Sequence, residues 1–118
     1  MAAGVLSSVV LDCPDPERLA GFYRELTGWE VTYRSEAYVF LGDGPVRIGF
    51  QRVGGYQPPP WPADGARARL DFTVAELDPA VEAALRAGAT RPEHRAGGEH
   101  GVTLLDPDGH PFCLARPR

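Results

Sequence analysis

Two stretches of the chain decide its fold, because they repeat one pattern: SVVLDCPDPERLAGFYRELTGWEV from Ser8 to Val31, and RLDFTVAELDPAVEAALRAGATRP from Arg69 to Pro92. Each stretch reads as a short strand, an Asp-Pro pair, a helix, a glycine and a further extended segment. An internal repeat of this kind predicts two copies of one structural unit within the chain.

Two helices are predicted, one in each copy, and each has signals for its start and its end. The signals are an aspartate as N-cap, a proline at the first helical position and a terminating glycine: Asp15, Pro16 and Gly28 in the first copy, and Asp78, Pro79 and Gly88 in the second. Apolar residues recur at helical spacing between these signals: Leu19, Phe22, Tyr23 and Leu26, and then Val81, Ala84 and Leu85. Each helix is therefore expected to bury one apolar face.

Strands are predicted after each helix. Tight Asp-Gly turns at 42–44 and 106–109 join the β-rich runs 37–41 and 45–53, and the runs 101–105 and 110–116. A further strand is expected at 29–34 (WEVTYR), whereas the matching stretch 89–100 is poorer in strand formers and its Pro92 suggests an edge.

The element order is then βαβββ, linker, βαβββ, with about eight strands and two helices. We expect a single α+β domain over residues 1–118, with one module at about 5–54, an extended linker at about 55–66 and a second module at about 67–118.

Composition and charge exclude several classes of protein. The net charge is −4, and the 12 basic residues, all arginine, form no block, so nucleic acid is not an expected partner. No apolar run reaches the roughly 20 residues of a membrane helix, and no basic segment precedes the apolar start. We therefore expect a cytoplasmic protein without a signal peptide or a membrane partner. Cys13 and Cys113 are expected to be free thiols, since disulfides are rare in the cytoplasm.

Alternation along the strands separates two faces of the predicted sheet. The apolar set is expected under the helices: Val9, Leu11, Cys13, Ile48, Phe50, Leu70, Phe72, Val74, Phe112 and Leu114. The other set mixes polar and apolar residues: Ser8, Val10, Arg47, Gly49, Gln51, Arg69, Asp71, Thr73, Pro111 and Cys113. This mixed face is either a plain solvent face or the wall of a cavity in which a few polar groups orient a ligand.

The most specific motifs are RLDFTV (69–74) and DPDGHPFCL (106–114), preceded by SVVLDCPDP (8–16) and LTGW (26–29). With these motifs the chain resembles the vicinal oxygen chelate superfamily, which includes glyoxalase I, extradiol dioxygenases and the bleomycin and fosfomycin resistance proteins. It is most similar to the short actinobacterial-type glyoxalase-like domain proteins. The resemblance implies two βαβββ modules that form a curled mixed sheet around a cavity, often completed in a homodimer.

Metal-dependent members of that superfamily place four ligands on four strands, and the resemblance puts Ser8, Gly49, Arg69 and Cys113 at those positions. Glycine offers no ligand atom, arginine is a permanent cation, serine is a poor ligand at neutral pH and one thiol cannot hold a metal alone. A shift of one residue would offer Gln51 or Asp71, which still leaves an incomplete set. The usual metal site is therefore not expected, and no cofactor is expected.

The same face offers other groups for binding. The candidate ligand-binding residues are Ser8, Phe40, Arg47, Gln51, Tyr56, Trp61, Arg69, Asp71 and Cys113. Arg69 and Asp71 either pair with each other or leave an arginine fork for an anionic or carbonyl-bearing ligand. The aromatic candidates suit a planar ligand, although Phe40 can equally belong to the core and Trp61 can pack the linker onto the sheet.

Two functions from different classes follow from these residues. The first is a metal-free protein that binds a small planar or anionic molecule. The second is an enzyme of the same superfamily, either a metal-free acid–base lyase or isomerase or a metal-dependent lyase or dioxygenase. A structural or dimerisation module is a third, which no motif favours. Catalytic residues stay unassigned: Cys113 would need a neighbouring base, His110 is interpreted as structural, and His94 and His100 only flank a Gly-rich loop.

Overall fold

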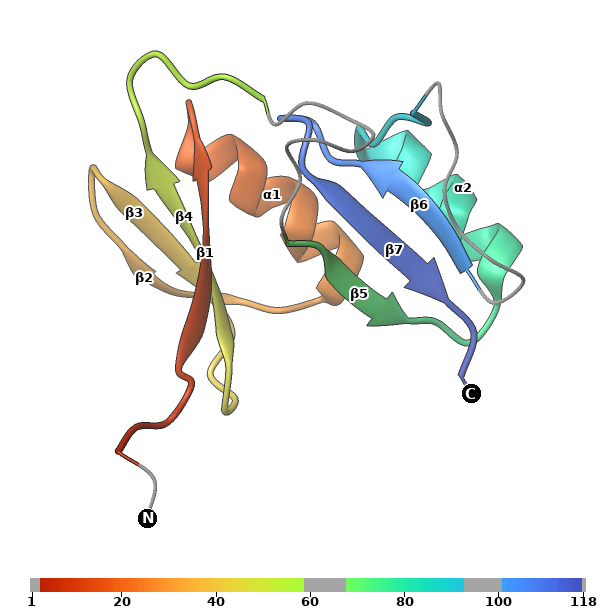
Figure 1. Cartoon of the computed structure of the whole chain (residues 1–118), viewed down its shortest axis with the longest axis horizontal. Coiled ribbons are helices and arrows are strands. Elements are labelled where there is room, and N and C mark those ends of the chain that lie inside the picture. Colours follow the sequence, from red (N-terminus) through yellow and green to blue (C-terminus); the bar gives the residue numbers. More distant parts are fainter. Residues whose placement is uncertain (1–2, 59–67, 93–100, 118) are drawn as a thin grey trace. The chain divides into compact units, whose positions relative to one another are not determined.

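The computed structural model describes residues 3–58, 68–92 and 101–117, and the chain divides into two units, residues 1–56 and 57–118 (Figure 1). Each unit is described by itself. The first contains β1 (Ser8–Cys13), α1 (Pro16–Thr27), β2 (Val31–Arg34), β3 (Tyr38–Leu41) and β4 (Arg47–Arg52). The second contains β5 (Leu70–Thr73), α2 (Leu77–Ala87), β6 (Gly101–Leu105) and β7 (Pro111–Ala115). The predicted α+β class is confirmed.

The first unit is a four-stranded mixed sheet in the order β1-β4-β3-β2. β1 and β4 are parallel, and the other two pairs are antiparallel. The crossover between the parallel strands includes α1, which packs on β3 and β4 (Figure 1). The predicted βαβββ order is therefore present in this unit.

α1 begins and ends where its sequence signals place it. The Asp15 carboxylate accepts hydrogen bonds from the backbone N–H groups of Glu17 (3.2 Å) and Arg18 (3.4 Å), and Pro16 is the first helical residue. Gly28 ends the helix with φ +73°, a left-handed conformation that glycine adopts without steric cost, and its N–H donates to the Arg24 carbonyl (2.8 Å).

The core of the first unit lies between α1 and the sheet. The rings of Tyr23 and Phe50 are stacked with centroids 5.5 Å apart, and both side chains are fully buried. The register pairs Val39 with Phe50 and Leu41 with Ile48, so these buried side chains share the face under α1. The predicted assignment of the apolar strand residues to the helix side is correct here.

The start of α2 differs from the sequence prediction. Asp78 and Pro79 were expected at the N-cap and at the first helical position, but the N-cap is Glu76 and the helix begins at Leu77. The side chain of Glu76 makes no capping hydrogen bond. Pro79 fits because N–H groups in the first turn have no partner within the helix, so the missing donor costs nothing there. Asp78 instead places its negative charge in the first turn, where the helix dipole favours it.

The second unit contains a three-stranded mixed sheet in the order β5-β7-β6, with β5 parallel to β7 and β6 antiparallel to it. Phe72 and Phe112 meet edge to face at 6.2 Å, and α2 packs on β7 (Figure 1). No helix among the described residues is long and apolar enough to cross a membrane.

The eighth strand that was expected over residues 89–100 is not a strand in its described part. Over residues 89–92, Thr90 forms one isolated antiparallel bridge with Leu105, and residues 93–100 lie outside the described residues. The described residues thus form the nine elements above, of which seven are strands rather than about eight. Pro92, which has no N–H to donate, follows the bridge closely, and this explains why pairing does not extend through it.

Candidate functional site

The face of the first sheet opposite α1 carries an aromatic cluster. The strand registers align Val10, Gly49, Phe40 and Tyr33 in one row across β1, β4, β3 and β2. Neighbouring positions on the same side of these strands are taken by Ser8, Asp12, Tyr38, Arg47 and Gln51. We call these nine residues the aromatic face.

Phe40 is the centre of the aromatic face. Its ring lies over Gly49 so closely that a Cβ atom at that position would come within 2.5 Å of Phe40 Cε2. Tyr38 stacks beside the ring at 5.9 Å and Tyr33 meets it edge to face at 6.1 Å. The Arg47 guanidinium carbon lies 4.7 Å from the Phe40 centroid, in a cation–π position. The arrangement combines apolar ring surface with one cation, Arg47, and one carboxylate, Asp12, beside Gln51. The Arg47 end of the face suits a planar ligand that carries a negative charge.

The face of the second sheet opposite α2 is polar. Asp71, Cys113 and Thr103 form one row across β5, β7 and β6, and we call them, together with Arg69, the polar face. The sequence pattern placed Arg69 on this strand, but β5 begins one residue later, at Leu70. The thiol of Cys113 is free and buried, and a Cβ atom at Gly101 would come within 2.9 Å of its sulfur, so the glycine leaves room for it.

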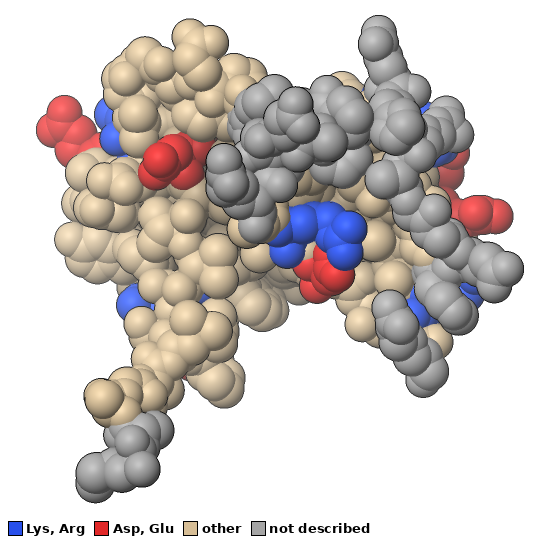
Figure 2. Space-filling model, in the orientation of Figure 1, with Lys and Arg blue, Asp and Glu red and all other residues tan. Residues whose placement is uncertain are grey.

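Arg69 and Asp71 pair in a bidentate manner. Arg69 Nε donates to Asp71 Oδ1 (2.6 Å) and Arg69 Nη2 donates to Asp71 Oδ2 (3.1 Å). The hydrogen bonds to Asp71 raise the pKa of Arg69, partial burial opposes this, and the charges of Asp71 and Cys113 raise the pKa further. Both side chains stay about half exposed, at 46% and 57%. Figure 2 shows a blue and a red group side by side over the start of β5. The pair leaves other guanidinium N–H groups of Arg69 available to a ligand.

Thr103 is a residue that the sequence analysis missed. It is 3% exposed, and its Oγ1 atom has no hydrogen-bond partner in the part of the chain that the structure describes. An unpaired buried hydroxyl is costly, so a native protein that keeps one calls for an explanation. The alternation in GVTLL (101–105) places Thr103 on the mixed face, but no sequence signal shows that its hydroxyl lacks a partner.

The predicted site residues fall into two groups. Ser8, Phe40, Arg47 and Gln51 lie together on the aromatic face of the first unit, and Arg69, Asp71 and Cys113 lie together on the polar face of the second. Tyr56 is half-buried beyond the end of β4 and belongs to neither face, while Trp61, His94 and His100 lie outside the described residues. Tyr33 and Tyr38 join the first group. The alternation in YVFL predicts the side of Tyr38, whereas a register shift between Val31 and Tyr33 sets the side of Tyr33.

His110 has the structural role expected of it. Its Nδ1 lies 2.8 Å from Asp106 Oδ2, and Asp106 Oδ1 also accepts the backbone N–H groups of Asp108 and His110. The side chain of Asp106 is fully buried. These bonds hold the turn between β6 and β7.

The residues at the four family metal positions do not fit a divalent metal. Gly49 has no side chain, and the Phe40 ring fills the space where a longer residue would project. Arg69 places a cation in the second unit, paired with Asp71. Ser8 and Cys113 add one hydroxyl and one thiol, which are too few ligands. No group of three or more His, Cys, Asp or Glu residues within the described ranges is arranged to hold a metal.

Comparisons with known proteins agree with the fold. A family model described as a glyoxalase-like domain matches residues 8–115. None of the curated proteins matches the chain.

Three solved structures illustrate the likeness. A glyoxalase/bleomycin resistance protein/dioxygenase family enzyme from Burkholderia phytofirmans PsJN has a TM-score of 0.75 and 23% identity, over 96% of this chain and 98% of that one. A glyoxalase-related enzyme from Fulvimarina pelagi has a TM-score of 0.70 and 22% identity, over 95% and 87%. A fosfomycin resistance protein from Mesorhizobium loti has a TM-score of 0.70 and 16% identity, over 100% and 95%. At these identities the likeness concerns the fold. Since the family model spans most of the chain, the chain belongs to the glyoxalase-like domain family of the vicinal oxygen chelate superfamily.

Proposed function

We propose that this protein binds a small planar, anionic molecule without a metal ion, as a binding protein of the glyoxalase-like family. The observation that carries the proposal is the aromatic face. At a position where metal-dependent relatives are expected to have a ligand, this chain has Gly49, covered by the Phe40 ring with Arg47 beside it. The face is therefore suited to stacking and to charge pairing rather than to metal coordination.

The size and charge of the aromatic face support this class of ligand. The Tyr38 ring lies 5.9 Å from the Phe40 ring at an angle of 26°, and the Tyr33 ring stands edge to face at 6.1 Å, so the rings offer an apolar surface against which an aromatic molecule can pack. Arg47 and Gln51 add hydrogen-bond donors at its border, and neither is fully exposed. A guanidinium in such a position can bind a carboxylate with two parallel hydrogen bonds.

The polar face supports the anionic part of the proposal independently. Arg69 is held in place by Asp71, so it is oriented before any ligand arrives. The unpaired Thr103 hydroxyl is a second group that a ligand oxygen would satisfy. We assign both residues to ligand binding, together with Cys113, which lies between Asp71 and Thr103 in the row.

An enzymatic role is the alternative, and the Arg69–Asp71 pair argues against its metal-free acid–base form. A general base needs a free carboxylate oxygen within reach of the proton that it removes. Both oxygens of Asp71 already accept hydrogen bonds from Arg69, so neither is free of a partner when a substrate proton approaches. Binding without turnover is the simpler function for this pair.

We further propose a cytoplasmic homodimer whose partner is a small molecule and not a nucleic acid. Val5 and Leu6, just ahead of β1, are exposed apolar side chains that a second copy could cover. On the face shown in Figure 2, the blue side chains of the described residues lie apart from one another rather than in one basic patch. Light scattering on the purified protein tests the dimer: a monomer mass at micromolar concentration would refute it.

The binding proposal is tested by calorimetric titration with benzoate, 4-hydroxybenzoate and 2-naphthoate, each beside its uncharged amide. We expect at least one carboxylate to bind, and to bind about tenfold or more tightly than its amide, since a charge-assisted hydrogen bond contributes about 1.5–3 kcal/mol. Arg47→Gln should remove most of that preference. Phe40→Leu should weaken the carboxylate and the amide alike, since it removes stacking and leaves the charge.

Arg52→Gln is the matched control for Arg47→Gln. Arg52 lies on the same strand, carries the same charge and donates to the Pro14 and Glu36 carbonyls instead of lying over Phe40. It should leave binding unchanged. If no carboxylate binds, or if the two arginine variants weaken it equally, the proposal is wrong. Elemental analysis of the purified protein provides a separate check, because stoichiometric Ni, Zn, Fe or Mn would favour the metal-dependent enzyme.

A further inference from the structure

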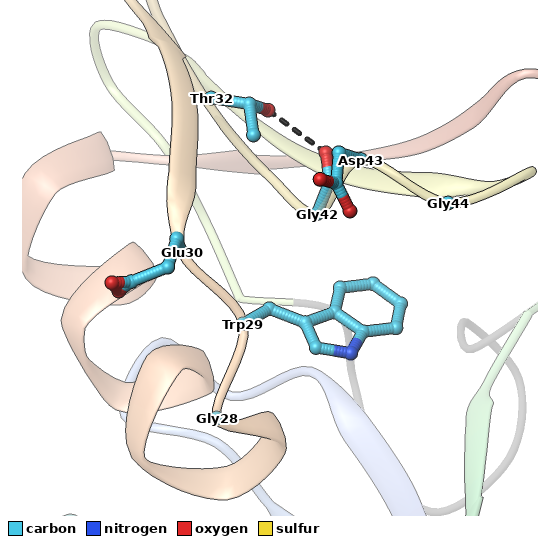
Figure 3. Close-up of a pocket in the computed structure, with 7 residues that line it drawn as sticks. All are labelled: Gly28, Trp29, Glu30, Thr32, Gly42, Asp43 and Gly44. Atoms are coloured by element: carbon cyan, nitrogen blue, oxygen red, sulfur yellow. Dashed lines mark hydrogen bonds between the residues drawn. The ribbon is translucent and has the colours of Figure 1, made fainter.

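A separate pocket lies in the first unit, where α1 ends and the β3–β4 hairpin turns (Figure 3). Its volume is about 340 Å³, enough for a small metabolite. Four side chains, those of Trp29, Glu30, Thr32 and Asp43, line it together with three glycines. It shares no residue with the aromatic face or the polar face, so any ligand there would be a second ligand.

Trp29 forms the apolar wall of this pocket and is held in place. Its backbone N–H donates to Thr27 Oγ1 (3.0 Å), and one edge of the indole packs on Gly42. A Cβ atom at Gly42 would come within 2.7 Å of Trp29 Cε3, and the φ of +92° also favours glycine there. The residue is still 39% exposed, so part of the indole faces open space.

The charge of the pocket is negative. In Figure 3 the Asp43 carboxylate points toward the indole from the opposite wall, and Glu30 points away from it toward α1. Glu30 is paired with Arg24 (3.0 Å), whereas Asp43 makes no ion pair within the described residues. None of the described residues that line the pocket is basic. The C-terminal end of α1, with its partial negative charge, also borders it at Gly28.

The remaining polar group of the pocket is already satisfied. Thr32 Oγ1 donates to the Gly42 carbonyl (2.8 Å), a bond that also ties β2 to the hairpin (Figure 3). The pocket therefore offers a ligand two unused features, the indole surface and the Asp43 carboxylate. An aromatic ring and an acceptor-only anion that face each other recognise a cation, because both attract positive charge.

We propose that this pocket binds a small organic cation, an alkylated ammonium group, between the Trp29 indole and the Asp43 carboxylate. The indole supplies the cation–π contact, for which tryptophan is the most favourable side chain. Asp43 supplies the counter-charge. An anionic ligand of the kind proposed for the aromatic face is excluded here by the same charges, so the two sites differ in the sign of the ligand.

The test uses choline chloride and its uncharged carbon isostere, 3,3-dimethyl-1-butanol, at constant ionic strength. Two-dimensional ¹H–¹⁵N NMR spectra of the labelled protein report where each compound binds. Choline should shift the signals of the Trp29 indole N–H, Gly42 and Gly44 in a saturable manner, in the millimolar range expected for a partly exposed site. The isostere, which has the same shape without the charge, should bind at least about fivefold more weakly.

Variants separate the pocket from general charge effects. Asp43→Asn should weaken choline binding at least about fivefold, and Trp29→Leu should abolish saturation at Gly44. Glu36→Gln removes an exposed carboxylate elsewhere in the same unit and should change nothing. Equal binding of choline and its isostere, shifts that do not saturate, or equal effects of the Asp43 and Glu36 variants would each overturn the proposal. The proposed anion site plays no part in any of these outcomes.

Discussion

The two units place different chemistry on the same scaffold. In the first, the sheet face opposite the helix carries three aromatic rings and one arginine, grouped around a glycine. In the second, the corresponding face carries an ion pair, a thiol and a hydroxyl. Both sheets have a parallel pair that is joined through a helix. Among the described residues only the first sheet has a fourth strand, β2, which carries Tyr33, so the two faces differ in their side chains and in the number of strands. A repeated unit can thus keep its core while the free faces of its two copies carry different chemistry.

Gly49 explains why the faces could diverge. With a glycine on β4, the Phe40 ring can lie flat on the backbone, and Tyr33 and Tyr38 gather around it. No described residue of the second unit places such a ring over its central strand, where Cys113 occupies β7 and its sulfur lies against Gly101. One small residue on each face therefore decides which neighbouring group fills the space.

The largest expected effect comes from undoing this arrangement with Gly49→Glu, which introduces the residue type expected of a metal-dependent relative. The new side chain must displace Phe40, so we expect a loss of at least about 2 kcal/mol in the free energy of unfolding. Binding of the aromatic carboxylates should be lost as well, since the ring platform is broken. Chemical denaturation followed by circular dichroism measures the first effect, and calorimetry the second.

Gly21→Glu is the control for that variant. Gly21 lies within α1, and a Cβ atom there meets nothing within 4 Å. The change should be neutral or should stabilise the helix by up to about 1 kcal/mol, because glycine is a poor helix former. If both glycine variants lost the same stability, the position of Phe40 over Gly49 would not be the reason.

The second-largest expected effect concerns the polar face, and it is a gain in stability rather than a loss. Thr103→Val keeps the shape of the side chain and removes the unpaired hydroxyl, so the free protein should gain about 1 kcal/mol of stability. The same change should weaken the binding of any ligand that forms a hydrogen bond with this hydroxyl. A loss of stability would mean that the hydroxyl already has a partner, such as a buried water, in the free protein. Thr73→Val, at an exposed position on β5, should change neither quantity appreciably.

Sequence reasoning located most of this arrangement and missed what depends on close packing. Alternation placed Ser8, Arg47 and Gln51 on one face because a strand has a period of two, and the registers agree. It left open whether Phe40 belongs to that face or to the core. It could not show that the Phe40 ring lies on Gly49, or that Thr103 has no partner. Those facts depend on side-chain rotamers and on neighbouring strands, which periodicity does not encode.

The helix starts show the same limit on a smaller scale. Asp15-Pro16 and Asp78-Pro79 look alike in the sequence, yet only the first aspartate is an N-cap. Proline is tolerated anywhere in the first turn, so the dipeptide does not fix which residue begins the helix. The contact between Trp29 and Gly42 could not be predicted from the sequence either. Trp29 precedes β2 and Gly42 follows β3, so the two residues meet only because these strands pair.

The third prediction compares the N-caps of the two helices. Asp15→Ala removes two long capping hydrogen bonds, so we expect a loss of about 0.5–1 kcal/mol in stability. Glu76→Ala should cost less, because the Glu76 side chain makes no capping bond. Denaturant titrations of both variants provide the comparison. An equal loss in the two would show that the caps contribute through the helix dipole alone and not through the hydrogen bonds.

The smallest expected effect is the pH dependence of the stability that the Glu17–Arg34 pair contributes. This pair connects α1 to β2 in the first unit. Arg34 Nε and Nη2 donate to the two Glu17 oxygens (2.7 and 3.1 Å), and these hydrogen bonds lower the pKa of Glu17 below its ordinary value of 4.5. Because the pKa of Glu17 is lowered in the folded state, the pair contributes its full stability above pH 4.5. That stability is lost as the pH falls through the folded-state pKa of Glu17. Both side chains are more than half exposed, so solvent screens the pair and the effect should be smaller than that of Asp15→Ala.

The stability difference between the natural protein and Glu17→Gln should therefore be small at neutral pH and vanish in acid. Glu82→Gln on α2 should show no such trend, since within the described residues no ion pair involves Glu82, and a matching trend there would assign the effect to the overall charge of the protein instead.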